Sequence, residues 1–200
     1  MLPPSRFALR WASADDVAVM RAPSRTYAAL VEQAERGSWG RAMRRPALVL
    51  LTLGVASAIA ATGRVTASLV ASTMLVWCWV IAAQMMAGLA LVATARTRRV
   101  SVPAAVELFF AGHLPWSLWA CVIAAWHAAD APFGIEVAGC AALVAMALTI
   151  RILVAFSRIV LGAPERDARL RTLAHQAFTW FVVVAFFAAT SGGWYRLLQP

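Results

Sequence analysis

The chain has 200 residues, of which 62% are hydrophobic and only 14% are charged, and its mean hydropathy is +0.73. This composition excludes an ordinary soluble globular domain and is typical of a protein embedded in a bilayer. The formal net charge of +9 comes from 18 basic residues, all of them arginine, but these gather at the ends of apolar runs and so indicate membrane orientation rather than nucleic-acid binding.

The leading segment, residues 1–45, is predicted to be a basic cytoplasmic segment with short amphipathic helices. It has no apolar stretch followed by a cleavage site, so the first span is expected to direct insertion. One short helix is predicted over ADDVAVM and a second after Pro23. An apolar face of the second helix consists of Tyr27, Leu30, Val31 and Ala34. This pattern fits an interfacial helix, and it fits a helix docked on other protein equally well.

Residues 46–200 are predicted to form an all-α transmembrane bundle. Its five apolar runs lie at about 46–62, 67–94, 102–126, 136–157 and 173–191. The first run is just long enough for the ~17–25 residues that a membrane helix needs, and the second exceeds this range, so it must tilt or extend beyond the hydrocarbon. Only Gly63 and Arg64 separate the first two runs, which predicts a tight helical hairpin.

The orientation follows from the arginines. The segments that flank the predicted spans alternate between arginine-rich and arginine-poor, starting with the rich leading segment. By the positive-inside rule the N-terminus is expected in the cytoplasm and the C-terminus in the periplasm or outside, in a cell inner membrane. The basic residues expected at the membrane interface are Arg41, Arg44, Arg45, Arg96, Arg98 and Arg99.

An intramembrane ion pair is predicted between Glu107 in the third span and Arg151 in the fourth. A charged residue in a span costs ~2.5–3.5 kcal/mol, so by default it has a partner or a role. At ~1.5 Å per residue, Glu107 lies about 7 Å and Arg151 about 10 Å below the cytoplasmic interface. The pair would fix the register of the two helices or, alternatively, serve as an ion or proton relay or a headgroup site; Arg151 could also reach the interface unaided.

A candidate pocket is predicted around a kink in the third span. Pro115 removes a backbone hydrogen bond and Gly112 favours bending there. The residues assigned to this pocket are His113, Pro115, Trp116, Trp119 and Gln84. The alternative is a neutral His113 inside a packed bundle and a Gln84 that forms an interhelical hydrogen bond.

Signatures of enzymes and of cofactor or metal sites are lacking. The chain has no G-x-S-x-G, H-E-x-x-H, Walker or G-x-G-x-x-G motif. Cys78, Cys121 and Cys140 stand singly in apolar runs and are expected to be small buried hydrophobic residues. No catalytic residue, cofactor or metal is predicted.

Three stretches resemble bacterial members of the Yip family of five-span membrane proteins. They are the entry "APSRTYAALVEQAERGSWGRAM", the proline-broken "FFAGHLPWSLW" and the exit "RILVAFSRIVLGAPERDARL". The resemblance covers most of residues 22–191 and implies a cytoplasmic N-terminus and five helices. Eukaryotic members are associated with Rab GTPases and vesicle traffic, but the acidic-aromatic motif of those members is not found here, so neither that role nor any functional residue is transferred.

The leading hypothesis is a non-enzymatic integral membrane protein that binds a partner at its cytoplasmic face or organises membrane lipids. The alternative is a subunit of a small-molecule or lipid transporter with a polar track of Glu107, His113 and Arg151. A membrane-embedded enzyme is the weakest hypothesis. The small predicted interior is compatible with a homo-oligomer, which no residue specifies, and no nucleic acid is expected to bind.

Overall fold

The computed structural model describes residues 12–33, 37–95, 97–128 and 135–197, and within these ranges every regular element is a helix. Of residues 12–14, 123–128, 135–136, 138, 183–184 and 186–197 it describes the backbone alone. The elements are α1 (Ala12–Arg21), α2 (Pro23–Gln33), α3 (Trp39–Ala42), α4 (Arg44–Thr62), α5 (Ala67–Ala93), α6 (Val102–Phe110), the 3₁₀ turn η1 (Ala111–His113), α7 (Leu114–Ala128), α8 (Ile135–Ile159) and α9 (Glu165–Leu197). The predicted all-α class is confirmed for this part of the chain.

Four helical stretches are long and apolar enough to cross a membrane. They are Trp39–Thr62, Ala67–Ala93, Val102–Val122 and Gly139–Ile159, and they coincide with the first four predicted spans. The fifth predicted span, 173–191, lies inside α9, and most of its side chains after Val182 are outside the described set. The described residues thus provide four candidate spans, as fits a multi-pass protein embedded in a membrane.

The first two spans form the tight helical hairpin that the sequence predicts. α4 ends at Gly63, whose φ of +67° lies in the left-handed region that glycine favours. The two helices approach closely at Gly54, where an added Cβ would lie 2.5 Å from Met74 Cγ. Thr73 Oγ1 donates a hydrogen bond of 2.7 Å to the Gly54 carbonyl. A small residue at position 54 is therefore required for this contact.

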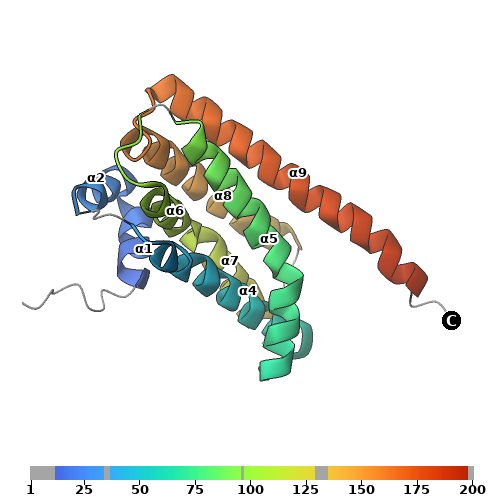
Figure 1. Cartoon of the computed structure of the whole chain (residues 1–200). Coiled ribbons are helices and arrows are strands. Elements are labelled where there is room, and N and C mark those ends of the chain that lie inside the picture. Colours follow the sequence, from blue (N-terminus) through green and yellow to red (C-terminus); the bar gives the residue numbers. More distant parts are fainter. Residues whose placement is uncertain (1–11, 34–36, 96, 129–134, 198–200) are drawn as a thin grey trace, which may run out of the picture.

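The leading helices pack on the bundle. Figure 1 shows α1 and α2 beside α6 and α8, and α2 lies mainly against α8 while α1 lies against η1. Val19 and Tyr27, both fully buried, join Phe109 and Phe156 in one hydrophobic cluster. Of the two alternatives for the second leading helix, the structure agrees with a helix docked on protein. The protein on which it docks is the helical bundle of the same chain. Residues on both sides of position 45 contribute to this cluster.

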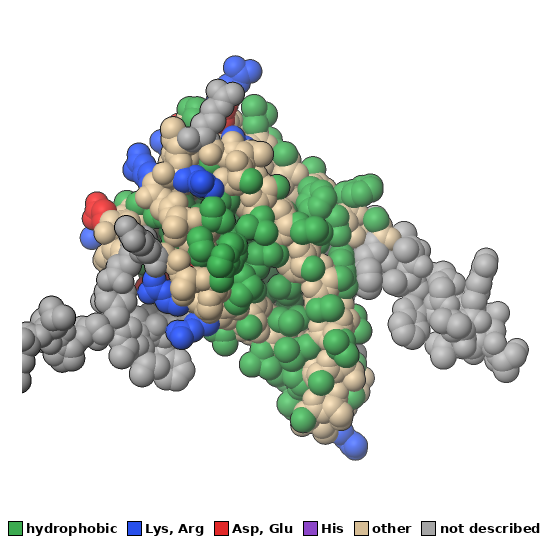
Figure 2. Space-filling view, in the orientation of Figure 1, with side chains coloured by type: hydrophobic (Ala, Val, Ile, Leu, Met, Phe, Trp, Pro, Cys, Tyr) green, Lys and Arg blue, Asp and Glu red, His purple; other side chains and the backbone are tan. Residues whose placement is uncertain are grey.

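Charged side chains gather at one end of the bundle, whereas hydrophobic side chains cover the face between its ends (Figure 2). We call this end, formed by residues 94–95, 97–101 and 158–171, the basic end; its exposed arginines are Arg98, Arg99, Arg158, Arg166 and Arg169. Arg64 lies at the opposite end, in the turn between α4 and α5. Between the ends, large apolar side chains such as Leu75 (73% exposed) and Phe181 (71%) point outward. Such a surface requires an apolar environment.

Candidate functional site

The third candidate span is a broken helix. α6 ends at Phe110, one 3₁₀ turn follows at Ala111–His113, and α7 begins with Pro115 in its first turn. Proline lacks a backbone N–H and its ring crowds the preceding turn, which explains why the helix changes type there. The Ala111 N–H still donates to the Glu107 and Phe109 carbonyls, and side chains from other helices add donors to the last turn of α6, where lipid can supply none.

Tyr27 of α2 supplies the first of these donors. Its hydroxyl donates a hydrogen bond of 3.2 Å to the Leu108 carbonyl, and its ring, fully buried, makes an edge contact with Phe156 at 5.9 Å between centroids. Burial raises the pKa of the Tyr27 phenol, so the hydroxyl keeps its proton and remains a donor. Gly112 permits the approach, since an added Cβ there would lie 3.5 Å from Tyr27 Oη and 2.7 Å from Ile152 Cγ2.

Arg45, in the first turn of α4, supplies the second donor. Its Nη1 donates to the Glu107 carbonyl at 3.3 Å, and its Nη2 lies 3.6 Å from Asp15 and 3.4 Å from Asp16 of α1. The Arg45 side chain is only 7% exposed. Its predicted place at the lipid headgroups is therefore wrong, because the two aspartates of the docked α1 draw the guanidinium into the protein.

The other predicted interface arginines behave differently from Arg45. Arg44, Arg98 and Arg99 are exposed and Arg41 is half-buried, whereas Arg96 lies outside the described residues. The four described side chains are thus accessible from outside the bundle. Among the described arginines of this set, only Arg45 connects three elements, namely α1, α4 and α6.

The surroundings of Asp16 are unfavourable to the charged form of its carboxylate. Burial raises its pKa from the ordinary 3.8 to about 6, although the attraction of Arg45 acts in the opposite direction; repulsion from Asp15 adds to the rise. Its buried Oδ1 has no hydrogen-bond partner within the described part of the chain and has only the ion pair with Arg45. The charged form of Asp16 is therefore incompletely compensated in the folded protein.

We expect Asp16→Asn to change how stability depends on pH. Since the folded protein holds the Asp16 proton more tightly than the unfolded chain, the contribution of Asp16 to stability is greatest below pH about 4, falls as the pH rises to about 6, and is constant above that. Thermal midpoints in detergent from pH 4.5 to 7.5 would measure this. The variant should gain on the wild-type protein as the pH rises, and two parallel curves would contradict the expectation.

The predicted ion pair between Glu107 and Arg151 is not formed. Arg151 Nη2 instead donates two hydrogen bonds of 2.8 Å, to the carbonyls of Met20 and Arg21 in the last turn of α1. The carboxylate of Glu107 has no ion-pair or hydrogen-bond partner among the residues described. The depth argument failed because α2 covers the face of α8, so the end of α1 reaches Arg151 first. A cation at the C-terminus of α1 also suits the helix dipole.

Separation of Glu107 from Arg151 predicts additive mutational effects. A direct contact would make the combined loss smaller than the sum of the single losses. We instead expect Arg151→Leu to cost about 1 kcal/mol through its lost bonds to α1, and Glu107→Gln to add independently, within about 0.5 kcal/mol. Unfolding free energies of the two single variants and the double variant in detergent would measure this. A coupling free energy above about 1 kcal/mol between the two substitutions would instead indicate a direct contact between Glu107 and Arg151.

The residues of the predicted pocket do not converge on one cavity. His113 stacks on Phe110 at 4.8 Å between centroids and meets the edge of Phe109 at 5.2 Å. Trp116 makes edge contacts with Trp119 at 5.9 Å and with Trp180 of α9 at 5.8 Å. Pro115 is buried in the first turn of α7. The kink region is therefore packed with aromatic rings.

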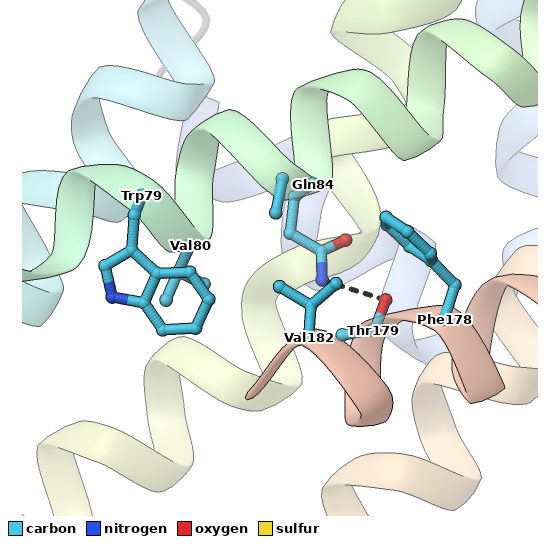
Figure 3. Close-up of a pocket in the computed structure, with 7 residues that line it drawn as sticks. Trp79, Val80, Gln84, Phe178, Thr179 and Val182 are labelled. Carbon is cyan, nitrogen blue, oxygen red and sulfur yellow. Dashed lines mark hydrogen bonds between the residues drawn. The ribbon is translucent and has the colours of Figure 1, made fainter. Parts of the chain in front are cut away.

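Gln84 belongs to a separate, small pocket between α5 and α9. Its Nε2 donates to Thr179 Oγ1 at 3.1 Å, the interhelical hydrogen bond that the alternative for Gln84 predicts (Figure 3). The other lining residues are Trp79, Val80, Ala83, Phe178 and Val182. With a volume of about 10 Å³, the pocket has room for one water molecule at most.

A second histidine approaches the break from α9. The imidazole of His175 meets the edge of Phe109 at 5.4 Å, on a ring that also contacts His113. The Nδ1 atoms of both histidines are buried and without hydrogen-bond partners in the described structure. In the described ranges no group of three or more His, Cys, Asp or Glu side chains could hold a metal ion. The expectation that the three cysteines are buried is wrong, because all three side chains lie on the outside of the bundle.

The residues that meet at the break were not grouped by the sequence analysis. Tyr27 was expected on an apolar face, Arg45 was placed at the membrane surface, and Asp15 and Asp16 were assigned to no site. One available signal is the adjacent acidic pair in a segment otherwise rich in arginine. The spacing of apolar residues in the sequence, however, does not indicate which arginine forms an ion pair with these two aspartates.

We compared the chain with known proteins in three ways and found no relative. Neither the protein-family models, nor the curated proteins, nor the solved structures contain a match to the chain.

Proposed function

We propose that this chain is a non-enzymatic, multi-pass membrane protein whose docked leading helices bind a partner or organise the surrounding membrane. The observation that carries the proposal is the pair of donors at the break. Tyr27 and Arg45 donate to the carbonyls of Leu108 and Glu107 in the last turn of α6. These bonds join the leading segment to the broken span. Displacement of the leading segment is therefore coupled to a change in the broken span.

The outer face of α2 is the surface that we assign to the partner. Arg25, Ala29 and Glu32 follow one another at i, i+4 and i+7 and are all exposed. Tyr27, on the opposite face, is fully buried. A partner that displaces α2 would therefore remove the hydroxyl of Tyr27 from the Leu108 carbonyl in the third span.

The proposed topology has five spans, with α9 as the fifth. At ~1.5 Å per residue, its 33 residues extend about 50 Å, more than the ~30 Å of the hydrocarbon core. The arginine-rich basic end supports a cytoplasmic location for the leading segment and for the connections α5–α6 and α8–α9, in a cell inner membrane. Membership of the Yip-type family is part of the same proposal and rests on the three resembling stretches alone.

The transporter alternative has less support in the geometry. Its polar track would join Glu107, His113 and Arg151, yet Arg151 is engaged with α1 and His113 is packed against Phe109 and Phe110. Neither the small pocket between α5 and α9 nor a cavity at the basic end is lined by any of the three residues.

Two measurements on the same cysteine-free background test the proposal. First, a photo-reactive residue at position 25, 29 or 32 should give a discrete protein or lipid adduct in native membranes, and position 76 in α5, which is exposed between the ends of the bundle, serves as the matched control. Second, a single cysteine at position 113 should resist a membrane-impermeant thiol reagent. Labelling of position 113 from the aqueous phase, with no adduct specific to α2, would reject the proposal in favour of transport.

A further inference from the structure

A cavity of about 320 Å³ lies at the basic end, remote from the break in the third span. It is bounded by Ala95 and Thr97 of the α5–α6 connection, by residues 161–164 of the α8–α9 connection, and by Asp167 and Arg171 of α9. Its volume is at the lower end of the ~300–1,000 Å³ typical of small-molecule sites. The cavity therefore suits a ligand of headgroup size.

The walls of the cavity are fixed by contacts between the two connections. Thr97 Oγ1 lies 3.4 Å from the carbonyls of both Leu161 and Gly162, and Arg99 N–H donates to the Val160 carbonyl at 3.2 Å. Gly162 has a φ of +67°, and an added Cβ would lie 2.6 Å from the Thr97 carbonyl oxygen. The two connections thus approach so closely that only glycine fits, which gives the cavity a preformed shape.

Arg171 presents a positioned, unneutralised cation. Its guanidinium donates to Thr94 Oγ1 at 2.8 Å, to the Thr94 carbonyl at 3.0 Å and to the Leu91 carbonyl at 3.4 Å. No carboxylate of the described residues lies within ion-pair distance of it. Since a guanidinium has five N–H donors, two remain, which is the number that a bidentate phosphate accepts.

Asp167 presents an unpaired anion one helical turn before Arg171. Residues at i and i+4 of a helix often pair, but Arg171 turns toward the end of α5 and leaves this carboxylate without an ion-pair partner in the described structure. One cavity is therefore lined by a free carboxylate and by a guanidinium with free donors. A ligand that satisfies both must carry an anionic and a cationic group a short distance apart.

We propose that this cavity binds a phosphoethanolamine group, with its phosphate on Arg171 and its ammonium on Asp167. A purely anionic phosphate or phosphoglycerol group would leave Asp167 repelled and unpaired. A choline group has no N–H to donate and is usually held by aromatic rings, and none of the described residues that line this cavity is aromatic. The exposed Leu170 and Leu173 on the same stretch of α9 favour a lipid as the carrier of the group.

The site is independent of the proposed function, because no hydrogen bond or ion pair among the described residues joins its lining to α1 or α2. The test uses the full chain in nanodiscs that contain equal amounts of phosphatidylethanolamine, phosphatidylcholine and phosphatidylglycerol with identical acyl chains. Native mass spectrometry then measures which lipid stays bound. We expect a preference for phosphatidylethanolamine on the order of tenfold, the size of effect that one charge-assisted hydrogen bond produces.

Two variants assign the preference to its residues. Asp167→Asn should abolish the advantage of phosphatidylethanolamine over phosphatidylglycerol, and Arg171→Gln should lower the retention of all three lipids. Glu32→Gln and Arg166→Gln are the matched controls, because both residues are exposed and neither lines the cavity. Asp167 is exposed and holds no structural bond, so its variant remains informative even if Arg171→Gln does not fold.

A separate experiment decides whether the phosphoethanolamine group belongs to a phospholipid or to a soluble molecule. Delipidated protein in detergent is titrated with O-phosphoethanolamine while its thermal midpoint is followed. Selective lipid retention assigns the group to a phospholipid, whereas stabilisation by the free compound without selective retention assigns it to a soluble molecule, and either result supports the site. Equal retention of the three lipids without a response to O-phosphoethanolamine, or a preference that survives Asp167→Asn, overturns it.

Discussion

Replacement of Arg45 by alanine is expected to lower the free energy of unfolding by about 3 kcal/mol. The change leaves Asp15 and Asp16 without a counter-ion and the Glu107 carbonyl without its side-chain donor. Removal of one partner from a buried ion pair typically costs ~3–5 kcal/mol. We expect the lower end of this range because the two aspartate side chains remain 28% and 20% exposed. Equilibrium unfolding in mixed detergent micelles is the measurement.

The neighbouring residue provides the control for Arg45. Arg44→Ala removes the same charge from an exposed side chain, so it should change stability by no more than about 0.5 kcal/mol. A triple variant, Arg45→Met with Asp15→Asn and Asp16→Asn, removes the buried charges together and should recover most of the loss. Equal stability of Arg45→Ala and Arg44→Ala would mean that the cluster does not hold α1 on the bundle.

Much of the framework could be predicted because each feature depends on residues close together in the chain. Apolar length located the first four candidate spans, and Gly63 marked the turn between two of them. Pro115 predicted the break in the third helix, since its effect reaches only one turn back. The interhelical bond of Gln84 followed from the cost of an unpaired amide among apolar residues.

The candidate site could not be predicted because its contacts connect distant parts of the chain. Arg151 reaches the end of α1 across about 130 residues, and Arg45 meets the Glu107 carbonyl across 62. Matching depths in the membrane made Glu107 a reasonable partner for Arg151, but depth does not say which helix lies alongside. The docking of α1 and α2 decided that question, and their amphipathic pattern fitted an interfacial position equally well.

Replacement of Tyr27 by alanine is expected to detach the leading helices at a cost of about 3 kcal/mol or more. The ring is fully buried, and truncation of a buried aromatic residue costs ~3–5 kcal/mol. Tyr27→Phe keeps the ring and loses the bond to Leu108, so it should cost only about 1 kcal/mol. Limited trypsin digestion after the exposed Arg21 and Arg25 measures the detachment. Because cleavage of a transiently open segment follows its population, a loss of about 3 kcal/mol should accelerate digestion on the order of 100-fold.

Glu32→Ala, an exposed substitution on the same helix, is the control and should leave the digestion rate nearly unchanged. The same variants also test whether the leading segment and the break are coupled. If the Tyr27 side chain holds the third span in its packed form, its removal should expose a cysteine placed at position 113 to an aqueous reagent, whereas Tyr27→Phe should not. Fast digestion with no change at position 113 would show that α2 leaves without disturbing the break, and the coupling on which the proposed function depends would then be absent.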